Sequence, residues 1–219
     1  MNIGIVVCTH NRPHYLKKCL DSINKSLIPK NAILFFVDDG SEDTRVKKII
    51  NDFCKNIGNS FALYKTRTGI HGSLAIGFKL AIQHGCDVLI NIDSDAVVSK
   101  NWIEVLIKLH LSHSDTIVSG FNTLSCDVHT KQPRHPVVAN GDGYVLKKSI
   151  GGINMCFSKG VYKKYVEQNL RDNWDWNVCR KMRTYDKYFV VSKPSVIQHI
   201  GIDGMHNLNP DVSHDFIEV

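Results

Sequence analysis

The sequence lacks long hydrophobic runs, a cysteine framework and a glycine-rich phosphate loop near its start. Its 219 residues are 43% hydrophobic and 22% charged, an ordinary balance for a soluble globular protein. No apolar stretch approaches the ~20 residues of a membrane-spanning helix. The apolar run at residues 3–8 is too short for the core of a signal peptide. We therefore expect no transmembrane segment and a cytoplasmic protein.

The cysteines follow neither a disulfide pattern nor a zinc-binding pattern. They are odd in number and scattered, and they include no Cys-x-x-Cys pair, which argues against both kinds of site. Several fall on apolar faces, where a free thiol behaves as a small hydrophobic group. We expect reduced core residues at Cys8, Cys19, Cys54, Cys86, Cys126, Cys156 and Cys179.

The net charge of +6 and the pI near 8.9 would suit anionic partners such as nucleotide phosphates, acidic lipid surfaces or nucleic acid. The basic residues are spread along the chain, however, and no nucleic-acid recognition module is visible. We expect a solvated basic surface and no nucleic-acid partner.

Strands and helices alternate through the first half of the chain. Apolar runs predict strands at residues 2–8, 32–37, 61–64, 88–92 and 116–120. Between them, apolar residues recur at helical spacing, and the first helix is expected to begin at Pro13. This alternation implies right-handed parallel crossovers and a doubly wound α/β sheet.

The pattern changes after about residue 121. Residues 122–143 have the composition of an irregular loop, which in a compact domain is either functional or mobile. The tail, residues 201–219, is expected to form a loop or lid. Between them we expect antiparallel strands at 144–147 and 153–157 flanking Gly151-Gly152, helices at 161–168 and 174–182, and closing strands at 188–191 and 196–199.

Polar clusters follow three of the expected strands. They are Thr9-His10-Asn11-Arg12, Asp38-Asp39 and Asp93-Ser94-Asp95. Parallel strands bring their carboxyl ends to one edge, where open α/β sheets bind ligands. Two carboxylates one residue apart suit Mg²⁺ or Mn²⁺ shared with a diphosphate. Taken alone, the Asp-Ser-Asp tripeptide is more often a polar turn that caps the next helix, and only the neighbouring motifs favour a ligand site.

Together these motifs resemble glycosyltransferase family 2, a family of inverting enzymes that use nucleotide-diphosphate sugars. The resemblance rests on residues 5–12, 36–41 and 91–95, which occur in the order and at the spacing of the family. It implies the GT-A (Rossmann-like) fold, a mostly parallel central sheet flanked by helices, with a small antiparallel element in the C-terminal half. A single domain would then comprise a nucleotide-sugar-binding half, residues 1–121, and an acceptor and catalytic half, residues 122–219.

The second half carries three further similarities. Residues 173–177 resemble the late acidic motif that supplies the catalytic base, although Trp174 stands where the family often has glutamate. Residues 196–201 resemble a segment that supplies a histidine metal ligand in some GT-A enzymes. Residues 151–154 resemble the loop under the donor sugar and acceptor.

The resemblance implies a role for each matching residue. Asp175 would be the catalytic base, and Asp95 and His199 would bind Mn²⁺ or Mg²⁺. Gly152, Trp174 and Trp176 would contact the donor or acceptor sugar. The nucleotide would be bound by Thr9, Asn11, Arg12, Asp39, Asp93 and Ser94. Independently of the resemblance, Arg67 lies in the loop after the third expected strand, where a cation could meet the phosphates of the nucleotide.

Other readings of these residues stay open at this stage. Asp175 could be a surface helical residue between two core tryptophans, and His199 a buried histidine satisfied by the backbone. Arg67 could simply be solvated. His206 is a further candidate for contact with the diphosphate.

We therefore expect a metal-dependent hexosyl- or N-acetylhexosaminyltransferase that uses a nucleotide-diphosphate sugar, with UDP favoured. It would act with inversion on a hydroxyl of a glycan, lipid-linked glycan or protein. One alternative is a catalytically inactive sugar-nucleotide or glycan-binding module. Another is a sugar-1-phosphate nucleotidyltransferase, but that class has a glycine-rich loop after its first strand and residues 8–12 contain no glycine.

Overall fold

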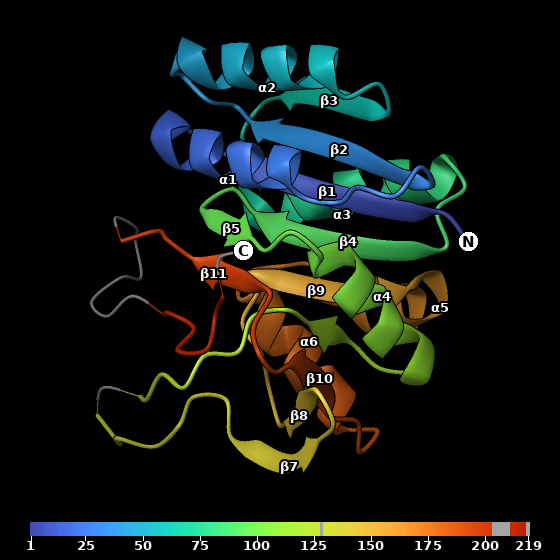
Figure 1. The fold of residues 1–219 in the computed structure, drawn as a ribbon, viewed down its shortest axis with the longest axis vertical. Helices are drawn as coiled ribbons and strands as arrows, with labels where there is room; N and C mark the ends of the chain where they lie inside the picture. The colour runs from blue at the N-terminus through green and yellow to red at the C-terminus, as the bar shows by residue number, and fades with distance from the viewer. Residues whose placement is uncertain (128, 203–210, 218–219) are drawn as a thin grey trace.

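A nine-stranded sheet forms the centre of the computed structural model, which describes residues 1–127, 129–202 and 211–217. Its strand order is β3-β2-β1-β4-β9-β6-β10-β8-β7 (Figure 1). The strands are β1 (Ile3–Thr9), β2 (Ala32–Asp39), β3 (Ser60–Lys65), β4 (Val88–Asp93), β6 (Val118–Ser119), β7 (Val137–Gly141), β8 (Tyr144–Lys147), β9 (Asn154–Ser158) and β10 (Phe189–Ser192). A small second sheet pairs β5 (Ala96–Val98) with β11 (Ile197–His199).

Strand direction differs between the two halves of the large sheet. β3, β2, β1 and β4 are all parallel, so their carboxyl ends share one edge, on the left of Figure 1. β9 runs antiparallel to both of its neighbours, β4 and β6, and β8 runs antiparallel to both of its neighbours, β10 and β7. The mostly parallel α/β sheet with an antiparallel element in the second half is therefore confirmed.

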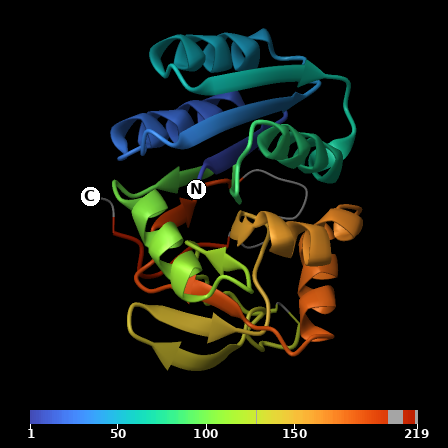
Figure 2. The same cartoon turned by 90° about the vertical axis from the view of Figure 1, so that its right-hand side faces the viewer.

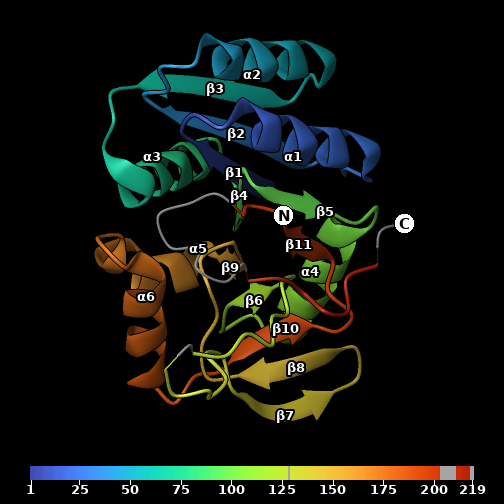
Figure 3. The same cartoon turned by 90° about the vertical axis from the view of Figure 1, so that its left-hand side faces the viewer.

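Helices cover both faces of the sheet (Figures 2 and 3). α1 (Pro13–Lys25), α2 (Thr44–Asn56) and α4 (Trp102–Ser112) lie on one face, where Leu16, Ile50 and Trp102 belong to one buried cluster. α3 (Gly69–Gln83) and α6 (Trp174–Arg183) lie on the other face with a second cluster. None of the helices within the described ranges is long and apolar enough to cross a bilayer.

The structure corrects several local expectations. β7 forms inside the expected irregular loop, although all its residues are exposed, because Gly143 (φ +74°) turns the chain back to pair with β8. β8 and β9 are not paired with each other. The expected helix at 161–168 is a short α-helical turn, α5 (Lys159–Val161), followed by a π-helix (Tyr162–Val166) and a 3-10 turn (Glu167–Asn169). Of the seven expected core cysteines, Cys54 is half-buried and Cys126 is exposed.

Candidate active site

The loop after β1 brings Thr9, Asn11 and Arg12 to the carboxyl edge of the sheet. Thr9 is 4% exposed, and its buried Oγ1 has no hydrogen-bond partner within the described part of the chain. Asn11 and Arg12 both adopt the left-handed conformation, with φ of 55° and 52°. The Asn11 side-chain oxygen accepts hydrogen bonds from the backbone N–H groups of Glu42 (3.0 Å) and Asp43 (3.2 Å). Asn11 thus ties this loop to the one after β2.

Asp39, at the end of β2, is buried and strongly hydrogen-bonded. Oδ1 accepts from the Lys65 ammonium and from the Thr68 N–H (2.8 Å), and Oδ2 accepts from the Gly69 N–H (2.8 Å). Burial raises the pKa of Asp39, but the hydrogen bonds from Lys65 and Thr68 outweigh it, so the net pKa is lowered. These three hydrogen bonds occupy most of the roughly four acceptor positions of the carboxylate.

The sequence analysis did not identify Lys65 as a residue of this site. It is the last residue of β3 and pairs in register with Asp39, so the strand-end argument that selected the aspartates would have found it. Arg67 follows on the same loop, with its backbone packed against Gly40 and its side chain exposed.

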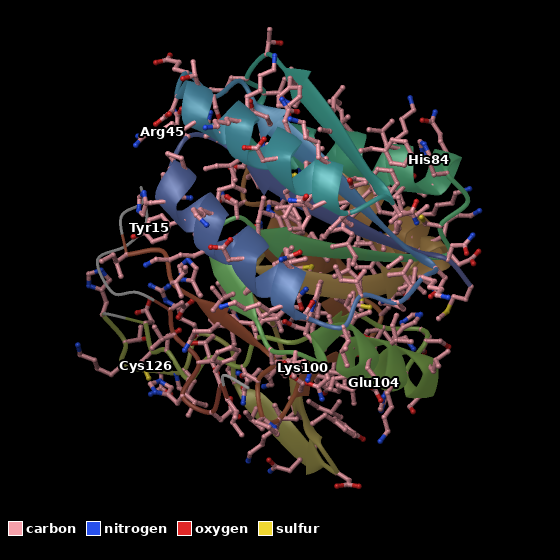
Figure 4. The ribbon with its side chains drawn as sticks, turned by 45° about the horizontal axis from the view of Figure 1, so that its top comes forward. Tyr15, Arg45, His84, Lys100, Glu104 and Cys126 are labelled. Atoms are coloured by element: carbon pink, nitrogen blue, oxygen red, sulfur yellow. The ribbon has the colours of Figure 1, made fainter. Side chains whose placement is uncertain are left out.

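Asp95 is the meeting point of three segments. Its carboxylate is nearly buried, and Oδ2 lies 3.0 Å from Arg12 Nη1 and 3.5 Å from His199 Nε2. Arg12 also lies over the ring of Tyr15, which Figure 4 labels near the beginning of α1. The backbone oxygen of Asp95 accepts from the Ile200 N–H (2.9 Å), so β11 holds His199 beside the Asp-Ser-Asp turn. Ser94 in that turn is buried.

The orientation of His199 is fixed by its second ring nitrogen. Nδ1 lies 3.1 Å from the backbone oxygen of Asp211, which can only accept, so Nδ1 carries a proton. In the neutral ring, Nε2 then presents its lone pair to Asp95. Burial lowers the pKa of His199, but the Asp95 carboxylate more than offsets this and the net pKa is raised.

Two acceptor atoms that face each other in this way suit a cation placed between them. Gly201 leaves room there, since a Cβ would lie 2.3 Å from Asp95 Oδ2 and 2.9 Å from His199 Nε2. A carboxylate oxygen and an imidazole nitrogen fit Mn²⁺, and the Asp211 carbonyl gives His199 the outer hydrogen bond that metal-bound histidines usually have. The described residues contain no cluster of three or more potential metal ligands. The pair would therefore need ligands from a substrate or water, and His206 lies outside the described residues.

Asp93 lies on the same edge, and its pKa is raised, chiefly by burial and then by the charge of Asp95. The charge of Asp175 raises the pKa of Asp93 as well, by a smaller amount. Asp175 is in the first turn of α6 and accepts a hydrogen bond from the Trp176 N–H (2.8 Å).

Gly152 connects the loop before β9 to the start of α6. A Cβ on Gly152 would lie 2.7 Å from the Trp174 ring and 3.4 Å from Asp175 Cβ. Trp174 is only 5% exposed and packs in the core beneath this loop, whereas Trp176 is 42% exposed. The two tryptophans that flank Asp175 therefore differ, and only Trp176 presents a large open surface.

His135 stacks on Trp176, and the sequence analysis did not identify it as part of this site. The two rings stack with centroids 5.5 Å apart and an interplanar angle of 25°. His135 is buried, and its Nδ1 lies 2.9 Å from the Ser149 hydroxyl, which donates in turn to the Arg134 backbone oxygen. No sequence pattern around residue 135 predicts this contact, because the fold brings together two residues that are far apart in the sequence.

The family profile of glycosyl transferase family 2 matches residues 4–187. The chain belongs to this family. A comparison with curated proteins finds no match.

Solved structures show the same fold. GalNAc-T7, crystallised with UDP, GalNAc and Mn²⁺, superposes with a TM-score of 0.73 at 14% identity, over 92% of this chain and 44% of that chain. The mannosyltransferase PcManGT from Pyrobaculum calidifontis, in complex with GDP-Man and Mn²⁺, superposes with a TM-score of 0.69 at 12% identity, over 94% of this chain and 58% of that chain. The family 2 chain has the GT-A fold and spans about half the length of these two proteins.

Proposed function

We propose that this family 2 chain is a glycosyltransferase that moves a hexosyl or N-acetylhexosaminyl group from a nucleotide-diphosphate sugar to an acceptor hydroxyl, with inversion. The observation that carries the proposal is the arrangement of Asp95 and His199, whose acceptor atoms face each other across 3.5 Å at the carboxyl edge of the sheet. Both structural neighbours were solved with a nucleotide or nucleotide sugar and Mn²⁺, which supports the same ligand class here.

Asp95 and His199 would hold Mn²⁺ or Mg²⁺, with the donor diphosphate and water as further ligands. When bound, the metal offsets the negative charge that grows on the leaving diphosphate. Arg12, whose Nη1 lies 3.0 Å from Asp95 Oδ2, would exchange this carboxylate for a phosphate oxygen of the donor. Arg67 supplies a second exposed cation on the adjacent loop.

The nucleoside would bind between the loops after β1 and β2. The unpartnered Oγ1 of Thr9 and the carboxylate of Asp39 suit a base that offers a carbonyl oxygen and an N–H group, as uracil does. We therefore favour UDP. Asn11 would keep the two loops together, while Asp93 and Ser94 would contact ribose beside the metal. In this arrangement residues 1–121 form the nucleotide-sugar half of one domain, and residues 122–219 form the acceptor and catalytic half.

Asp175 would act as general base on the acceptor hydroxyl. Inversion requires attack on the face opposite the leaving group, so base and diphosphate must lie on opposite sides of the donor sugar. Gly152 lets the loop before β9 pack directly on the start of α6, and Trp174 supports that contact from the core. Trp176, with 42% of its surface exposed, would be a platform for the apolar face of a sugar ring. A glycan, free or lipid-linked, or a protein hydroxyl could be the acceptor.

The first test is thermal unfolding in the presence of UDP, GDP, CDP and ADP, each with and without Mn²⁺. A ligand that binds only the folded state stabilises it by about 2.7 kcal/mol at a hundredfold excess over its Kd. We expect the largest rise in Tm for UDP with Mn²⁺. Asp95→Asn should abolish the Mn²⁺-dependent part of the rise in Tm. Asp21→Asn, which changes an exposed carboxylate of α1, should retain it.

Three other outcomes are informative. A rise for GDP or CDP alone would overturn the choice of base, and no rise for any nucleotide would overturn the proposed activity. A rise for UDP without transfer to any acceptor in a glycan panel would favour an inactive binding module.

A further inference from the structure

The last described stretch of chain, residues 211–217, lies beside β11 (Figure 3). Ser213 and Gln198 form a reciprocal pair, in which the Ser213 N–H donates to Gln198 Oε1 (2.7 Å) and Gln198 Nε2 donates to the Ser213 carbonyl (3.0 Å). Ser213 also forms an antiparallel bridge with Thr123. The stretch is therefore bound on two sides, by β11 and by the segment after β6.

Asp215 anchors this stretch. Its Oδ1 accepts from the Ser195 N–H (3.1 Å) and hydroxyl (2.6 Å), and its Oδ2 accepts from the Asn122 side-chain amide (3.1 Å). Partial burial raises the pKa of Asp215, but the hydrogen bonds from Ser195, Ser213 and Asn122 outweigh it, and the net pKa is lowered. Asp215 is therefore a half-buried anion stabilised by hydrogen bonds from three residues.

A buried lysine faces the same stretch. Lys147, on β8, is 1% exposed, and its Nζ donates to the Thr123 backbone oxygen at 2.5 Å. A buried ammonium is unfavourable unless opposite charges compensate it. Burial lowers the pKa of Lys147 to about 8, and the two charges that oppose this shift are those of Asp215 and Asp211. Both belong to residues 211–217.

The same stretch holds the candidate metal ligand. The Asp211 backbone oxygen accepts from His199 Nδ1 at 3.1 Å, and Asp211 Oδ1 accepts from the Thr123 hydroxyl at 3.1 Å. Thr123 therefore contacts both Lys147 and Asp211. A continuous set of hydrogen bonds and charges links the buried lysine to the imidazole.

We propose that residues 211–217 form a clamp that positions His199: Lys147 and Asp215 anchor the clamp, and the Asp211 carbonyl fixes the imidazole with Nδ1 protonated and Nε2 toward Asp95. This inference rests on the proposed function, since it gives His199 a metal to bind. Asp215 and Lys147 are positioning residues in this account and do not contact the substrate.

The test uses the full chain and the variant Asp215→Asn, which keeps the shape of the side chain but removes its charge. Free Mn²⁺ is measured by electron paramagnetic resonance during a Mn²⁺ titration with UDP present. The imidazole tautomer is read from ¹⁵N spectra, with His199→Gln identifying the His199 signals. We expect the Kd of Mn²⁺ to rise about tenfold, the lower end for an outer-shell partner, and the Nδ1–H signature to give way to a mixture of tautomers.

Asp142→Asn is the matched control, because it removes an exposed carboxylate from the β7–β8 turn and should change neither readout. The proposal is overturned if Asp215→Asn lowers Tm but leaves both the Mn²⁺ Kd and the His199 spectrum at wild-type values. If the wild type binds no Mn²⁺, the metal part of the proposed function fails, and the tautomer measurement still decides the positioning role.

Two further variants cover loss of folding and the role of the lysine. Thr123→Val removes the hydroxyl hydrogen bond to Asp211 without changing any charge, and it should shift both readouts in the same direction. If Asp215→Asn does not fold, the Mn²⁺ Kd and the His199 spectrum of Thr123→Val decide whether residues 211–217 position His199. Lys147→Met should reproduce the effect of Asp215→Asn, and the double variant should be no worse than either single one, because both residues act through the placement of residues 211–217. Additive effects would overturn the anchoring role of Lys147.

Discussion

Asp39 and Lys65 occupy paired positions at the ends of β2 and β3, and their side chains form an ion pair that is almost completely buried. Only 6% of the Asp39 side chain and 11% of the Lys65 side chain are exposed. Removal of one partner from a buried pair leaves an uncompensated charge, which costs more than the pair itself contributes. The pair therefore holds the β2 and β3 ends of the candidate nucleotide site together.

Lys65→Met should lower the free energy of unfolding at neutral pH by about 3 kcal/mol. The pKa of Asp39 is lowered in the folded protein, so its contribution is complete above the ordinary value of 3.8 and is lost as the pH falls through the folded pKa. The gap between wild type and variant should therefore narrow on acidification. Urea unfolding over a pH series measures this, and a gap that widens toward low pH would contradict the assignment.

Asp175→Asn should reduce the rate of sugar transfer by a factor of about 10² to 10⁴, the usual contribution of a general base. UDP and Mn²⁺ binding should be retained, because Asp175 belongs to α6 and not to the nucleotide loops. Asp172→Asn is a suitable control, since that side chain is 96% exposed and lies three residues away. Equal transfer by the wild type and Asp175→Asn would remove Asp175 from the mechanism.

Sequence reasoning succeeded where the signal is local. The apolar run at 88–92 predicted β4, and the rule that parallel strands share an edge placed Asp39, Asp93 and Asp95 together. It also found the start of α1 at Pro13. These features depend on neighbours within a few residues or on sheet direction alone.

What sequence reasoning missed depends on contacts between distant segments. His135 meets Trp176 across 41 positions (176 − 135), and the Asp211 carbonyl that orients His199 is a backbone atom with no sequence signature. β5 has only three residues and pairs with a strand about 100 positions away. Trp174 could have been assigned to the core, since Trp174, Val178 and Met182 recur every four residues on the buried face of α6.

His135 should make the protein less stable in mild acid. Its pKa is lowered to about 4, chiefly by burial, from an ordinary value of 6.5. Between these values the unfolded chain binds a proton that the folded protein does not, so stability falls as the pH decreases. The residue should account for a loss of about 2 kcal/mol between pH 7 and pH 5. His135→Gln should remove this part of the loss in urea unfolding, while His14→Gln, on an exposed residue, should not. An unchanged pH profile in His135→Gln would contradict the prediction.

Gly201→Ala tests the space between Asp95 and His199 directly. The added Cβ would lie 2.3 Å from Asp95 Oδ2 and 2.9 Å from His199 Nε2, so one of these groups must move. We expect a stability loss of about 1–3 kcal/mol from overpacking and a rise of about tenfold in the Kd of Mn²⁺. Gly58→Ala is the matched control, because a Cβ there would meet nothing within 4 Å. If Gly201→Ala is destabilised yet binds Mn²⁺ as tightly as the control, the cation does not lie between Asp95 and His199. A higher Mn²⁺ Kd in Gly201→Ala, with the Kd of Gly58→Ala unchanged, would instead locate the metal between Asp95 and His199. The substitution itself changes no charge and removes no ligand.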